Sequence, residues 1–141
     1  MKKKLMALML TLVLLVSLLP AVHAAEVIAS GHGWNVDWVL TDDGTLTISG
    51  DTYMRDDKSE LDSPWRKYMD VVKTIVIEEG VYGVERFAFT DFENVEEVSL
   101  PESLETIGMS AFAGCDSLIG TYQNITITGS TTWSLTGQIG D

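Results

Sequence analysis

The chain has 141 residues, 45% of them hydrophobic, and a formal net charge of −12 from 21 acidic residues against nine lysines and arginines. A polyanion of this size repels nucleic acid and anionic lipid headgroups, so neither is expected as a partner. The single cysteine, Cys115, excludes an internal disulfide, so the fold must be held together by packing.

The N-terminal segment has the features of an export signal. Three lysines precede an apolar run over residues 5–22, and Val22 and Ala24 place small residues at the −3 and −1 positions of a cleavage site. We expect cleavage before Ala25, which gives a secreted or cell-surface chain of net charge −15 that is not inserted in a membrane. A retained N-terminal anchor is the alternative, because the length of the run does not separate the two.

Residues 38–49 predict a β-hairpin. Apolar and polar residues alternate on both sides of Asp43-Gly44, a dipeptide that supplies the positive φ angles of a tight turn. The alternation gives the hairpin one apolar face, and that face needs another element to cover it. We therefore interpret residues 25–70 as an N-terminal cap that shields the first coil of the segment that follows.

An acidic stretch over residues 51–62 predicts a solvated loop, because it has almost no apolar side chains. Calcium is an alternative there, but the EF-hand spacing is absent, so we assign no metal or cofactor. The loop carboxylates are Asp51, Asp56, Asp57, Glu60 and Asp62. Ser63-Pro64 then predicts the start of a short helical turn that places Trp65 and Tyr68 on one side.

Residues 75–95 align without a gap on residues 98–118. Apolar residues coincide at eight positions, and the positions between them are mostly polar. A repeat in the range of roughly 20–29 residues indicates a solenoid, in which each coil buries its core only against its neighbours. The coinciding pairs are Ile75/Val98, Ile77/Leu100, Val81/Leu104, Val84/Ile107, Ala88/Ala111, Phe89/Phe112, Phe92/Cys115 and Val95/Leu118.

Each coil should begin with a short strand, at residues 74–77 and 97–100, whose alternate side chains point inward. Phe89 and Phe112 occupy the same place in successive coils, so we expect their rings to lie against each other. A third strand is expected at residues 125–127, where the register has slipped.

We assign the repeat coils to residues 71–128. Residues 129–141 hold few large apolar side chains and form either a partial C-terminal cap or the end of a longer array.

Residues 100–118 follow the pattern LPxSLxxIGxxAFxxCxxL. They resemble the BspA-type (Treponema pallidum-like) leucine-rich repeat family of bacterial surface proteins. The first coil is a weaker copy, with Glu85 and Phe92 in place of Gly108 and Cys115. The resemblance implies a β-rich α/β fold, a short right-handed solenoid with strands along one side. It also implies an exported protein without catalytic activity that binds proteins, glycans or other cells.

No group of residues supports catalysis. His32 is the only histidine after the leader, and Cys115 aligns with Phe92 at a buried position that keeps a thiol protonated. Paired carboxylates such as Glu78-Glu79 are typical of solvated turns. Sugar stacking on tryptophans is a further alternative, although packing in the core is the expected role of such residues. The tryptophans are Trp34, Trp38, Trp65 and Trp133.

The expected ligand-binding surface is the outward face of the strands, formed by Thr74, Val76, Glu97, Ser99 and Thr126. These residues alternate with the inward ones, so they should stand side by side across adjacent strands. The alternative is that hydroxyl side chains there are only those that any exposed sheet carries.

Our hypothesis is an adhesion-like binding module for an extracellular protein or glycan. The alternative is a structural element that self-associates through the open C-terminal edge of the solenoid.

Overall fold

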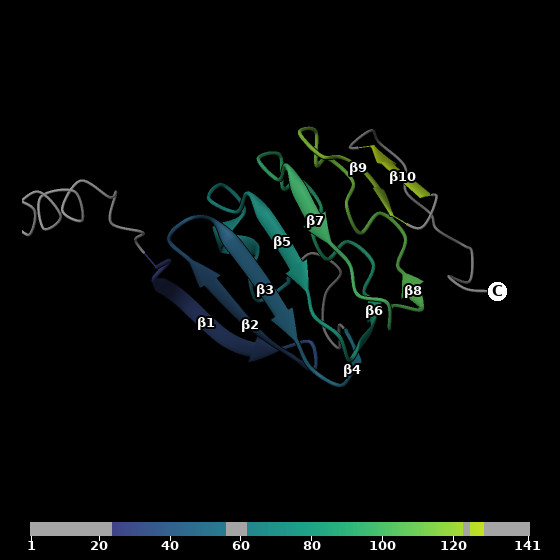
Figure 1. Cartoon of the computed structure of the whole chain (residues 1–141), viewed down its shortest axis with the longest axis horizontal. Coiled ribbons are helices and arrows are strands. Elements are labelled where there is room, and N and C mark those ends of the chain that lie inside the picture. Colours follow the sequence, from purple (N-terminus) through teal and green to yellow (C-terminus); the bar gives the residue numbers. More distant parts are fainter. Residues whose placement is uncertain (1–23, 56–61, 123–124, 129–141) are drawn as a thin grey trace, which may run out of the picture.

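The computed structural model describes residues 24–55, 62–122 and 125–128, and it is rich in strands (Figure 1). Within these residues there is one 3₁₀-helix and no α-helix, so the α component of the expected α/β class is absent. None of them forms a helix long and apolar enough to cross a membrane. The elements are β1 (Val27–Gly33), β2 (Val36–Thr41), β3 (Thr45–Ser49), β4 (Thr52–Tyr53), the 3₁₀-helix η1 (Arg66–Tyr68), β5 (Thr74–Ile77), β6 (Val81–Val84), β7 (Glu97–Ser99), β8 (Thr106–Ile107), β9 (Ile119–Tyr122) and β10 (Ile125–Thr128).

Five strands form one sheet in the order β1-β2-β3-β5-β7. The hairpin predicted over residues 38–49 is confirmed as β2 and β3, which pair antiparallel. β3 then pairs in parallel with β5, and β5 pairs in parallel with β7. The hairpin therefore extends the sheet of the coils from its edge.

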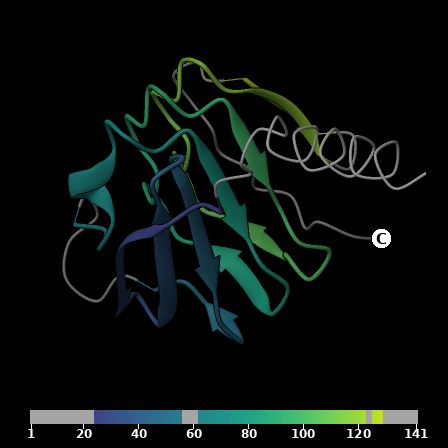
Figure 2. The same cartoon turned by 60° about the vertical axis from the view of Figure 1, so that its left-hand side comes forward.

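A second sheet, in the order β4-β6-β8, forms another side of the coil, and both of its strand pairs are parallel (Figure 2). A third side has no strands, but its backbone is still hydrogen-bonded between coils. The N–H groups of Phe89 and Asp91 donate to the carbonyls of Ala111 and Ala113, at 2.8 and 2.7 Å. Each coil is thus joined to the next along all three sides.

The stacking extends to the part of the chain before residue 71. Thr45 pairs with Thr74 in the same way that Thr74 pairs with Glu97, although the first of these two steps along the chain is longer. Trp65 donates its indole N–H at 2.9 Å to the carbonyl of Ala88 in the next coil. Residues 45–72 therefore follow the same path as the later coils, with a longer loop between β4 and Trp65.

The core is a continuous cluster of buried apolar residues that runs from the hairpin to Leu118. A stack of rings passes through it. Phe89 lies parallel to Phe112 with their centroids 5.2 Å apart, which confirms the predicted contact, and Trp65 stacks on the other side of Phe89 at 5.5 Å. This stack joins three successive coils.

Gly108 explains one position of the repeat pattern. A Cβ atom there would lie 2.2 Å from the backbone nitrogen of Arg86 in the previous coil. Because no side chain fits in that space, the close approach of two coils requires glycine at this point.

The helical turn begins later than predicted. Trp65, not Ser63, precedes η1, and no side chain caps the helix. Trp65 and Tyr68 also contact different partners. Trp65 packs against Phe89, whereas the ring of Tyr68 lies 5.8 Å from that of Trp38.

The expected third strand forms as β10, but it does not continue the parallel sheet. It pairs antiparallel with β9, and β9 is the strand that lies beside β7 (Figure 1). β9 follows β7 after about one repeat period, so the slip in register expected at residues 125–127 is wrong. The expected tail, residues 129–141, lies outside the described residues.

Candidate binding surface

The outward face of the five-stranded sheet carries its side chains in rows. Thr74 stands opposite Glu97, and Val76 stands opposite Ser99, because β5 and β7 pair in register. Their neighbours Ile75 and Val98 point to the other face, where Ile75 is buried. The structure therefore brings four of the five residues expected to bind a ligand onto one surface. Their role in binding stays a prediction.

The central row crosses all five strands. It runs through Ser30, Val39, Thr47, Val76 and Ser99, each opposite the next in the strand pairing. The three middle residues are half-buried and the two serines are exposed. The row is therefore an apolar and β-branched strip with a hydroxyl group at each end. We name these five residues the central row.

Thr126 does not join this surface. Its backbone lies in β10, opposite Thr121 of β9, in a separate two-stranded sheet. The expectation that placed it beside Thr74 and Glu97 is wrong because the chain reverses after β9, a turn that the repeat period does not indicate.

Three of the four tryptophans lie among the described residues, where they pack against other parts of the protein. Trp65 is fully buried and Trp38 is 6% exposed. Trp34 is half-buried and meets Trp65 edge to face, with ring centroids 5.6 Å apart. These contacts place Trp65 and Trp38 in the core, as expected of tryptophans in a cap. Trp133 lies outside the described residues.

The other chemically distinctive residues also have local partners. His32 of β1 contacts the Asp37 carboxylate of β2 at 2.8 Å, and both side chains are exposed. Burial raises the pKa of the Cys115 thiol to about 12, and its sulfur contacts the carbonyl of Phe89. A thiol in this environment stays protonated at neutral pH, so it is a poor nucleophile.

Three carboxylates of the acidic loop, Asp56, Asp57 and Glu60, lie outside the described residues, so calcium binding there stays an expectation. Among the residues that are described, no group of three or more histidine, cysteine or acidic side chains is placed to hold a metal.

The sequence interpretation missed two groups of residues. One is Glu79, whose carboxylate accepts hydrogen bonds from the N–H groups of Glu102 and Ser103, so it joins two coils. The other is a pair of tyrosines, Tyr53 and Tyr82, on the three-stranded sheet. The segment between these tyrosines includes the longer loop of the coil over residues 45–72. The period of the later coils therefore did not predict that Tyr53 and Tyr82 contact each other.

Coils that stack in register and present one face of a parallel sheet define a repeat protein of the solenoid class. Residues 67–136 match the family described as "BspA type Leucine rich repeat region (6 copies)". This part of the chain is therefore a leucine-rich repeat region of the BspA type, as the pattern at residues 100–118 indicated. Repeats of this class generally mediate protein interactions.

A solved structure supports the same conclusion. The chain is similar to a leucine-rich repeat protein from Eubacterium ventriosum ATCC 27560, with 29% sequence identity and a TM-score of 0.56. The similarity covers 65% of this chain and 24% of the other, so this chain spans about a quarter of that protein. No curated protein matches the chain.

Proposed function

We propose that the protein is an exported binding module that recognises an extracellular protein or glycan with the outward face of its five-stranded sheet. The observation that carries the proposal is the central row, because it offers a β-branched, largely apolar middle (Val39, Thr47 and Val76) with an exposed serine at each end. An interface of this kind excludes water at its centre and forms hydrogen bonds at its rim. Nothing in this function requires a catalytic group.

We propose that residues 1–24 are a leader that is removed on export. We further propose that the coils form a right-handed solenoid, as the resemblance to the family implies. Within residues 25–70, β1 and β2 cap the sheet, because β3 already pairs in parallel with β5. Sequencing the N-terminus of the secreted chain tests the first point, and a terminus other than Ala25 would contradict it.

The binding surface can be tested by placing a charge at its centre. Glycan arrays and pull-downs with extracellular proteins first identify a ligand. Val76→Lys then puts an ammonium group beside Thr47 in the half-buried middle of the central row, and we expect the affinity to fall about tenfold or more. Val71→Lys is the matched control, since Val71 is 48% exposed outside the sheet. Equal affinity of both variants and the parent chain would remove the site from this face.

The alternative function is self-association through the open C-terminal edge of the solenoid. The opposite edge of the five-stranded sheet is β1, which exposes Val27 and Ile28 at 62% and 55%. The pairing register of β1 shifts between Val27 and Ala29, and such an irregularity opposes edge pairing, so the alternative stays with the C-terminal edge. Light scattering of the same samples separates the two functions, because a monomer at high concentration contradicts assembly.

A further inference from the structure

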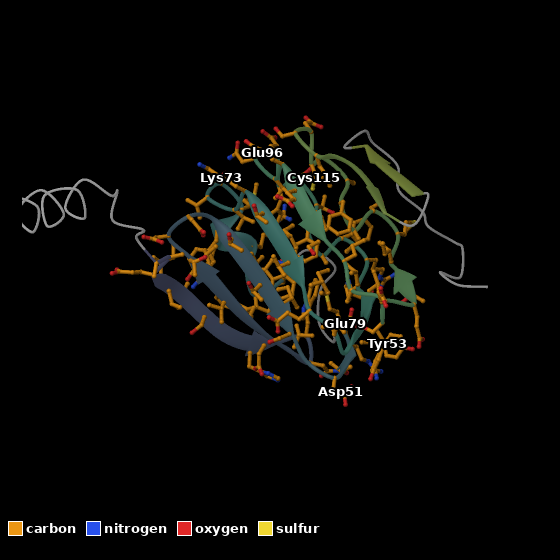
Figure 3. All side chains as sticks on the ribbon, viewed as in Figure 1. Asp51, Tyr53, Lys73, Glu79, Glu96 and Cys115 are labelled. Carbon is orange, nitrogen blue, oxygen red and sulfur yellow. The ribbon has the colours of Figure 1, made fainter. Side chains whose placement is uncertain are left out.

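A second surface with distinct chemistry lies on the three-stranded sheet. We name Asp51, Tyr53, Tyr82 and Glu105 the tyrosine platform. The hydroxyl of Tyr82 donates to the carboxylate of Asp51, and the hydroxyl of Tyr53 donates to the carboxylate of Glu105. Asp51 and Tyr53 lie at the edge of the molecule near β4 and β6, away from Cys115 (Figure 3). The four residues come from three successive coils.

The backbone beneath holds the ring of Tyr53 in place. A Cβ atom on Gly83 would lie 2.7 Å from Cδ1 of Tyr53, so the ring rests directly on the backbone of β6. The residue is nonetheless 46% exposed, which leaves part of the ring accessible to a ligand. The ring of Tyr82 adds a second surface, with the centroids 5.6 Å apart and the planes at 49°.

The hydroxyl hydrogen bonds fix the two rings at their far ends. A ring that is held at both ends loses little conformational entropy when a ligand binds to it. Each tyrosine pKa is raised, chiefly by its hydrogen bond to the neighbouring carboxylate. Both hydroxyls therefore stay protonated at neutral pH and can donate to the two carboxyl groups at the ends of the rings.

Charge determines which ligand suits this arrangement. A cation is attracted both to the faces of aromatic rings and to the carboxylates at their ends. An anion would be repelled by the carboxylates and by a chain whose net charge is −12. A neutral sugar would gain stacking on the rings but none of the charge attraction. The platform is thus complementary to an extended, positively charged partner.

We propose that the tyrosine platform binds lysine or arginine side chains of a basic segment in a partner protein. This site lies on a different sheet from the central row, so it is independent of the surface in the proposed function. It gives the module a second contact of opposite character, since one surface is apolar with hydroxyl ends and the other is aromatic and acidic.

Titration of the protein with a short oligoarginine peptide at physiological salt tests this inference. Calorimetry gives the affinity, and the ring signals of Tyr53 and Tyr82 in NMR spectra report the location. We expect Tyr53→Leu and Glu105→Gln each to weaken binding about tenfold, the effect of losing one cation–π or charge contact. Tyr53→Phe should keep most of the affinity, because it keeps the ring.

The matched control is Glu97→Gln, which removes an identical charge from the five-stranded sheet. Attraction to net charge alone would weaken binding equally in Glu97→Gln and Glu105→Gln, and that result would overturn the proposal. Absence of peptide binding would do the same, as would binding of an uncharged oligosaccharide at the tyrosines in place of the peptide. Thermal melts of each variant show that it is folded. Should Tyr53→Leu unfold, the conservative pair Tyr53→Phe and Glu105→Gln still decides the result.

Discussion

Glu79 shows how one carboxylate joins two coils. It accepts the N–H of Glu102 at 2.7 Å and that of Ser103 at 3.1 Å, and the hydroxyl of Ser103 accepts the N–H of Gly80 at 3.1 Å. Hydrogen bonds to the charged form favour ionisation, so the pKa of Glu79 is lowered, chiefly by the N–H of Glu102. The turn that leads from the first sheet to the second is thus fixed in successive coils.

The pH dependence of stability should reveal this contact. A lowered folded pKa adds stability above the unfolded value, near 4.5, and this stability is lost as the pH falls through the folded pKa. We expect Glu79→Gln to lower the midpoint of urea unfolding at pH 7, and the difference from the parent chain to close toward pH 3. Glu78→Gln, its exposed neighbour, is the control. A difference that is independent of pH would show that the charge is not responsible.

At the scale of elements, alternation identified the strands whose two faces differ. β5 was predictable because Ile75 and Ile77 alternate with outward residues, and β7 was predictable because Val98 repeats Ile75 one coil later. β6 was not, since Val81, Gly83 and Val84 are all buried and give no alternation. The three-stranded sheet that β6 forms with β4 and β8 is therefore not predicted by periodicity alone.

Two other elements were not predicted because a turn or loop next to them or within them departs from the usual pattern. β1 was missed because its turn to β2 uses Trp34 and Asn35, with φ angles of 55° and 65°, in place of the usual glycine. The coil over residues 45–72 was missed because its longer loop breaks the spacing of the later coils. The outward face was predictable because alternation fixes both faces of a strand. The tyrosine platform depends on that unrecognised coil, so it was not.

The ring stack predicts a strong dependence on Phe89. Phe89 is fully buried, with Trp65 and Phe112 on its two faces and Phe92 at its edge. We expect Phe89→Ala to reduce the free energy of unfolding by about 3–5 kcal/mol, as measured by urea titration. Met109→Ala is the control, because Met109 is 54% exposed in the next coil. A loss equal to that of the control would show that the stack does not support the coils.

At the scale of the whole molecule, one core joins the hairpin to the repeat coils. The buried cluster begins at Val36 in the hairpin and ends at Leu118 after the last described coil. Repeat proteins can unfold coil by coil, because each coil contacts only its neighbours. A chain of this size with a continuous core is instead expected to unfold as one unit. The hairpin should therefore lose its structure together with the coils.

Two natural probes at opposite ends of the core can test this expectation. Trp34, Trp38 and Trp65 report by fluorescence on the N-terminal strands and on the coil over residues 45–72, and Cys115 reports on the last described coil by alkylation. Cys115 is buried and its pKa is raised to about 12, so pulses of iodoacetamide should modify it only after unfolding. We expect both probes to give the same urea midpoint, measured in a Trp133→Phe background that removes the tryptophan outside the described residues. Modification of Cys115 at a lower urea concentration, with fluorescence unchanged, would mean that the coils separate from the C-terminal end while the hairpin stays folded.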